Sequence, residues 1–155
     1  MLPGRRRWRV ALWGVKSSKV VLLKKVPLFE GLSDRQLNQI ARLADEVEAR
    51  AGQKLARQGE TGREMFIIVE GEAVVKTRQG RTVRLTRGDF FGEMSLLDGS
   101  PRSATVEATT GMRLLVIGQR EFWALVATAP QITRRIMSAL SQRIREANAA
   151  YSACS

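Results

Sequence analysis

The chain has 155 residues, a length that fits one compact domain able to bury a core without disulfides or metals. A hydrophobic fraction of 44% and a charged fraction of 26% are typical of a globular chain rather than a disordered one. The sequence contains no histidine, which excludes Ser-His-Asp and Cys-His catalysis and zinc sites with histidine ligands. The single cysteine, Cys154, cannot form an internal disulfide or a thiolate metal cluster.

The net charge of +11 is concentrated at the N-terminus. Residues 1–25 hold eight of the 26 Arg and Lys residues and none of the 15 acidic residues. We interpret 1–25 as a basic extension outside the domain, either solvated or in contact with a polyanion or an acidic membrane surface. No stretch approaches the roughly 18 apolar residues of a transmembrane helix, so we expect a cytoplasmic protein.

The first predicted element is a helix over about 34–46. Ser33 to Gln36 has the form of a capping box, and apolar residues follow at helical spacing. Short β-branched runs with glycine-bearing turns then predict strands over 65–70, 72–77, 82–85, 103–108 and 112–117. Because turns this short cannot hold parallel crossovers, we expect an antiparallel sandwich or barrel.

Two helices are predicted after the strands. A short one ends near Thr128, and a longer one begins at Pro130, since proline fits the first turn of a helix. An apolar stripe follows the longer helix, and it could serve dimerisation or only pack on the barrel. Its members are Ile132, Ile136, Leu140, Ile144, Ala147 and Tyr151. Residues 151–155 are predicted to be a frayed tail.

The segment from Gly92 to Arg102 holds the candidate ligand-binding residues. Gly92 allows a sharp turn, and Glu93 to Leu97 could form one helical turn whose first amides make an anion site. The turn at 99–101 swings Arg102 back towards that site, and a guanidinium fork matches two phosphate oxygens. Glu93 would repel a phosphate but can accept from a sugar hydroxyl. Phosphate plus ribose indicates a nucleotide, although a turn with a surface ion pair is the alternative.

The run from Phe91 to Val106 resembles the phosphate-binding cassette of cyclic nucleotide-binding domains, whose pattern is roughly F-G-E-[LM]-[AS]-L-L-x-G-x-P-R-[AST]-A-T-V. Residues 26–32 and 66–72 resemble the opening and a strand pair of the same family, which includes bacterial channels, catabolite activators and protein kinase A regulatory subunits. The resemblance covers about 26–150 and implies one cyclic nucleotide-binding domain there. The implied fold is mainly β, a jelly-roll-like β-roll of about eight strands, with an N-terminal helix and two C-terminal helices.

The resemblance also implies roles for individual residues. Glu93 would bind the ribose 2′-OH and Arg102 the cyclic phosphate. The rest of the cradle would come from backbone amides and small side chains at Gly92, Met94, Ser95, Ser103 and Ala104. Val75 and Val83 could line the base pocket or could simply be core. Arg143 would cover the purine, with a solvated arginine as the alternative.

Ser103 lies at the base-discriminating position by resemblance. We expect cAMP to be preferred over cGMP, with a cGMP preference as the alternative, because one hydroxyl seldom discriminates more than about a hundredfold.

The function implied is a sensor whose last helix closes over the ligand and signals to a protein effector, in trans or in a longer parent chain. A degenerate fold that binds proteins and a nucleic-acid binder acting through residues 1–25 are the alternatives. We expect no enzyme activity, no metal and no cofactor, with cAMP or cGMP as ligand.

Overall fold

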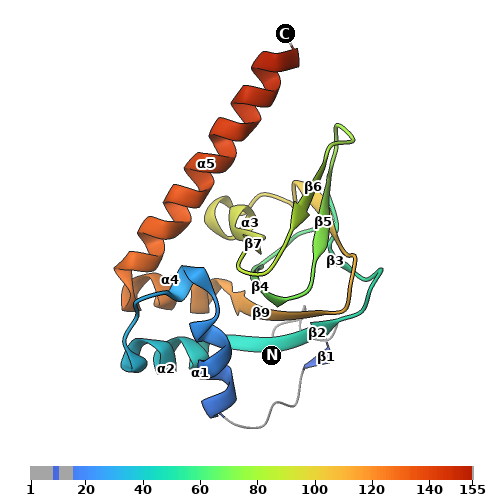
Figure 1. The fold of residues 1–155 in the computed structure, drawn as a ribbon. Coiled ribbons are helices and arrows are strands. Elements are labelled where there is room, and N and C mark those ends of the chain that lie inside the picture. The colour runs from blue at the N-terminus through green and yellow to red at the C-terminus, as the bar shows by residue number, and fades with distance from the viewer. Residues whose placement is uncertain (1–8, 11–15, 155) are drawn as a thin grey trace.

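The computed structural model describes residues 9–10 and 16–154. Within these residues, the strands form two antiparallel sheets, and helices precede and follow most of the strands in the sequence (Figure 1). The strands are β1 (Arg9–Val10), β2 (Ala44–Ala49), β3 (Lys54–Ala56), β4 (Glu64–Glu70), β5 (Ala73–Thr77), β6 (Thr82–Leu85), β7 (Phe90–Phe91), β8 (Ala104–Ala108) and β9 (Met112–Gly118). The helices are α1 (Lys16–Lys24), a 3-10 turn (Pro27–Phe29), α2 (Asp34–Leu43), α3 (Glu93–Asp98), α4 (Gln119–Thr128) and α5 (Pro130–Cys154).

The sheets have the orders β1-β2-β9-β4-β7 and β3-β8-β5-β6. Every strand pair described is antiparallel, which confirms the predicted class of β-fold. The five predicted strands are present, each displaced by no more than one residue at either end. The short strands β3 and β7 were not predicted, since three and two residues are too few to show an alternating pattern.

The helix predicted over 34–46 ends at Leu43, so its last three residues were predicted wrongly. Its start is as predicted: the Ser33 hydroxyl accepts from the Gln36 amide at 3.2 Å, and the Gln36 side chain accepts from the Ser33 amide at 3.1 Å. From Ala44 the chain instead forms β2, which pairs with β9 over six residues. The composition of β2, Ala-Asp-Glu-Val-Glu-Ala, has a low intrinsic preference for strands, so pairing with β9 decides its structure.

β4 is buried on both faces and separates two hydrophobic clusters. Met65, Ile67 and Val69 belong to the cluster shared with the helices. Phe66 and Ile68 alternate with them and belong to the cluster between the two sheets. The helices therefore pack on the outer face of the first sheet, while the second sheet covers its inner face.

Part of the predicted basic extension is packed into the fold. Leu22 and Leu23 of α1 are buried in the helix-side cluster. The Lys19 ammonium donates to the carbonyls of Ala41 and Ala44 at 3.0 and 2.9 Å, where α2 ends and its last carbonyls lack helical partners. The structure thus has an N-terminal helix, α1, in addition to the one that the sequence predicted.

α5 runs past α3, and its C-terminal end projects away from the sheets (Figure 1). Its backbone stays helical to Cys154, where the sequence predicted a frayed tail from residue 151. The apolar stripe of α5 is buried in its first half, at Ile132 and Ile136, whereas Ile144 is 61% exposed. Although α5 has 25 residues, no helix of the described chain combines the length and apolar character needed to cross a membrane.

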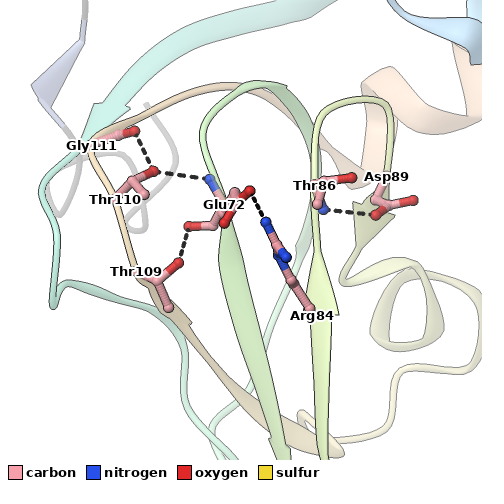
Figure 2. A network of polar contacts seen from close by, with 7 residues as sticks. All are labelled: Glu72, Arg84, Thr86, Asp89, Thr109, Thr110 and Gly111. Carbon is pink, nitrogen blue, oxygen red and sulfur yellow. Dashed lines mark hydrogen bonds and ion pairs between the residues drawn. The ribbon is translucent and has the colours of Figure 1, made fainter.

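A polar network centred on Glu72 holds one end of the second sheet (Figure 2). The Glu72 amide donates to the Thr110 hydroxyl and its carbonyl accepts from the Thr109 hydroxyl, each at 3.0 Å. Its carboxylate pairs with Arg84 of β6. This network fixes β5 at the end opposite to Thr77, which pairs with Ala104 at the start of β8.

Candidate functional site

Helix α3 is bracketed by two glycines in the left-handed region, where a side chain would be strained. Gly92 precedes it with φ 89°, and Gly99 follows it with φ 71°. Before Gly92, Phe90 and Phe91 form β7 and pair with β4. The predicted turn from Glu93 to Leu97 is therefore present, one residue longer than expected, and anchored to the first sheet.

Arg102 is 9% exposed, and its guanidinium is held by main-chain carbonyls from two elements. Nη1 donates to the Gly92 carbonyl at 3.0 Å, and Nη2 donates to the Glu64 carbonyl at 2.8 Å. The guanidinium carbon lies 5.7 Å from the centre of the Phe66 ring, which stacks on Phe91. The cation is thus fixed between the start of α3 and the start of β4.

The backbone of Arg102 is tied to the loop between β3 and β4. Its amide donates to the Glu60 carbonyl at 2.8 Å, and its carbonyl accepts from the Gly59 amide at 2.9 Å. Nearby, the Gln58 amide donates to the Thr105 hydroxyl at 3.1 Å. The two segments therefore run together as they approach the site, and Arg102 cannot shift as a whole without breaking these bonds.

Glu93 is 3% exposed and contacts a residue fifty positions away in sequence. Arg143 of α5 donates from Nη1 to Glu93 Oε1 at 2.6 Å and from Nη2 to the Phe90 carbonyl at 2.5 Å. Its guanidinium carbon also lies 4.6 Å from the centre of the Phe90 ring. Burial raises the pKa of Glu93, while the charges of Arg143 and Arg102 oppose that rise.

The predicted base-lining valines lie on the second sheet. Val83 of β6, Val75 of β5 and Val106 of β8 are direct cross-strand partners and therefore share one face. Val106 is buried in the cluster between the sheets, Val75 is partly buried, and Val83 is 40% exposed. The inner face of this sheet thus becomes accessible to solvent from β8 towards β6.

The remaining predicted site residues differ in what they could contribute. Ser95 is buried, whereas the Met94 side chain is 54% exposed, so Met94 could contribute its backbone rather than its side chain. Ser103 is exposed and Ala104 is partly buried, and Ala104 begins the strand that pairs with β5 at Thr77. Among the described residues, no three His, Cys, Asp or Glu side chains are grouped so that they could hold a metal ion.

Hydrogen bonds join four of the predicted residues in two pairs, Gly92 with Arg102 and Glu93 with Arg143. The two pairs are neighbours because Gly92 and Glu93 are adjacent in the chain. The sequence did not predict the part played by Phe90, which supplies both a carbonyl and a ring to Arg143. It also did not predict the Glu64 carbonyl, because a main-chain acceptor carries no signal in residue type. Phe90 could have been considered, since it directly precedes the cassette.

Comparisons with known proteins agree on one family. The family profile described as Cyclic nucleotide-binding domain matches residues 46–129, more than half of the chain. A cyclic nucleotide-gated potassium channel of Rhizobium etli is 40% identical over 122 residues, which are 79% of this chain and 34% of the channel. A cAMP-dependent protein kinase regulatory subunit of Schizosaccharomyces pombe is 38% identical over 114 residues, 73% of this chain and 28% of that subunit. The chain thus spans about a third of the length of these relatives.

Solved structures show the same likeness. The catabolite activator protein of Thermus thermophilus superposes with a TM-score of 0.73 and 29% identity, covering 81% of this chain and 62% of that chain. The regulatory domain of Toxoplasma gondii PKA, solved with cAMP, superposes with a TM-score of 0.72 and 25% identity, covering 82% of this chain and 50% of that chain.

Proposed function

The chain belongs to the family of cyclic nucleotide-binding domains, as its cassette suggested, and we propose that it is a sensor that prefers cAMP. The observation that carries this proposal is the pair of buried side chains with opposite charges, Arg102 and Glu93, both beside the start of α3. One suits a phosphate and the other a ribose hydroxyl, the two groups that a cyclic nucleotide presents side by side.

Arg102 is assigned to the cyclic phosphate. A guanidinium is planar and presents its N–H donors in a fixed fork that matches two phosphate oxygens, and the bonds to the carbonyls of Gly92 and Glu64 fix its plane. A hydrogen bond to a charged group contributes about 1.5–3 kcal/mol, and more where water is excluded. The amides of Met94 and Ser95, with Ser103 and Ala104, would complete the cradle.

Glu93 is assigned to the ribose 2′-OH, and its bond to Arg143 suggests how binding is signalled. An ionised carboxylate has two oxygens and can accept several hydrogen bonds, so a ribose hydroxyl can compete with Arg143 for it. On this proposal Arg143 has two positions, one in contact with Glu93 and Phe90 and another over the purine of a bound ligand. A ligand shifts such an equilibrium only by its difference in affinity for the two positions of α5.

The base would lie against the inner face of the second sheet. Val75 and Val83 supply apolar surface there, and the 40% exposure of Val83 is consistent with a wall that a ligand would cover. Ser103 could donate to either purine, so we expect preference for cAMP over cGMP to be modest. The output would pass from α5 to an effector, either in trans or attached in a longer parent chain. A homodimer formed through α5 and a contact of the basic extension with a polyanion or membrane surface stay predictions.

The test is calorimetric titration of the folded, nucleotide-free protein with cAMP and cGMP. We expect micromolar or tighter binding of cAMP, and Arg102→Ala should weaken it by at least about tenfold through loss of a charge-assisted bond. Arg120→Ala, which removes an exposed arginine of α4, is the matched control and should bind as the wild type does. Absence of heat with either nucleotide would refute the proposal, as would equal binding by the Arg102 variant.

A further inference from the structure

Gly62 lies in the loop between β3 and β4, far in sequence from the cassette. A Cβ atom placed on Gly62 would lie 1.9 Å from Nε, 2.1 Å from Cζ and 2.6 Å from Nη2 of Arg102. Non-bonded carbon and nitrogen atoms do not approach so closely, because attraction gives way to repulsion below about 3.5 Å. The guanidinium of Arg102 therefore occupies the space in which any side chain at position 62 would have to stand.

The backbone of Gly62 does not itself require glycine. Its φ is not in the positive region, unlike that of Gly59 at 84° and Gly92 at 89° in the same neighbourhood. Gly92 also lies close to Arg102, but its left-handed conformation already disfavours a side chain there. At Gly62 it is thus the Arg102 side chain, and not the backbone conformation, that leaves no room for a side chain.

We infer that Gly62 is a positioning residue of the ligand site. It leaves the volume that lets the Arg102 guanidinium lie against the loop and donate to the carbonyls of Glu64 and Gly92. This inference rests on the proposed function, in which Arg102 holds the cyclic phosphate. It adds a determinant of phosphate affinity that lies outside the cassette.

An alanine at position 62 should act on the Arg102 side chain rather than on the fold. The backbone of Arg102 is held by Glu60 and Gly59, so the whole residue cannot retreat. Its side chain is flexible and can rotate away, which relieves the clash and leaves these backbone bonds in place. The rotated guanidinium would lose its bonds to the two carbonyls and its aim at the phosphate. We expect cAMP affinity to fall about ten- to hundredfold, the effect of losing a hydrogen bond to a charged group.

The experiment compares Gly62→Ala with Gly111→Ala. Gly111 also lacks a positive φ, and a Cβ there would meet no atom closer than 4.0 Å. The two variants therefore add the same methyl group, at position 111 where there is room for it and at position 62 where there is none. Titration with cAMP and thermal unfolding are measured on both. The inference requires the loss of affinity in Gly62→Ala alone, with both variants folded and unfolding cooperatively. Equal affinities of the two variants would overturn it.

A double-mutant cycle distinguishes positioning from general damage. In an Arg102→Ala background the Gly62→Ala change should have no further effect on cAMP affinity, because the side chain it displaces is gone. Additive losses would overturn the inference. A crystal structure of Gly62→Ala decides the point even if the wild type binds no cyclic nucleotide. Displacement of Arg102 from the Glu64 carbonyl in that structure would support the inference, and an unmoved Arg102 would refute it. Because this result does not depend on nucleotide binding, failure of the inference is distinguished from failure of the proposed function.

Discussion

Glu93 combines burial with a nearby cation, and this makes its protonation depend on folding. Burial raises its pKa above the ordinary value of 4.5, so the folded chain binds this proton more tightly than the unfolded chain does. Binding of that proton stabilises the folded state fully at a pH below the pKa of Glu93 in the unfolded chain. This contribution is lost as the pH rises through the higher pKa of Glu93 in the folded chain.

Glu93→Gln removes this titration and keeps an oxygen that can accept from Arg143. We therefore expect the melting temperature of the variant, relative to wild type, to increase as the pH is raised from 4.5 towards neutrality. The measurement is thermal unfolding of both proteins across that range. Glu30→Gln, at an exposed position, serves as the control. A difference between Glu93→Gln and wild type that does not vary with pH would contradict the assignment.

The two charged residues of the cassette could be identified from the sequence because they lie within one short segment. Glu93 and Arg102 are nine positions apart, and the glycine-rich turn between them limits where the arginine can point. The partner of Glu93 could not be found in this way. Arg143 lies on a helix with several other arginines, and only the packing of α5 against α3 decides which one reaches the carboxylate.

Arg143, in the C-terminal half of helix α5, attaches the helix to the site. Ile132 and Ile136 bury the first turns, whereas further along Arg143 bonds Glu93 and Phe90. Arg143→Ala should therefore loosen the helix around residue 143 while its first turns stay protected. Hydrogen exchange of the α5 amides measures this, because local opening exposes them to solvent.

The control for that experiment is Arg145→Ala, two positions along the same helix, at an exposed residue. It makes the same change in charge and helix propensity, so it should leave exchange near residue 143 as in the wild type. Faster exchange in both variants, or in neither, would show that the bond to Glu93 does not hold α5.

The elements themselves differ in how far the sequence predicts them. β5 and β6 alternate and are joined by a glycine-bearing turn, so local pattern is enough to place them. β2 carries three acids in six residues and continues the helical spacing of α2. Its extended conformation depends on pairing with β9, nearly seventy residues later, and this pairing cannot be predicted from the local sequence of β2.

The folded domain begins earlier in the sequence than the charge pattern suggested. The basic character of residues 1–25 indicated an extension, yet α1 contributes Leu22 and Leu23 to the core and Lys19 to the end of α2. The apolar residues of this helix, Val20 to Leu23, are consecutive and follow four polar residues, so they show no helical periodicity that could reveal it.

Deletion of residues 1–25 should consequently destabilise the protein. Removing buried leucine side chains alone costs about 2–5 kcal/mol each when they are truncated to alanine, and the deletion removes two. Deletion of residues 1–8 is the control, because it lowers the positive charge and leaves α1 in place. Urea unfolding of both shortened chains gives the comparison. Equal stability of the two would mean that α1 does not support the core.

The contact between Arg143 and Glu93 also has a consequence for the time course of ligand capture. On the proposed function, the ribose needs a carboxylate that Arg143 holds, so the contact has to open before the complex is complete. Capture then has two consecutive steps, of which only the encounter depends on nucleotide concentration. As that concentration rises, the observed rate should approach a plateau, and the plateau reports how often α5 releases Glu93. The speed of the sensor would thus be set by its own helix and not by the supply of its ligand.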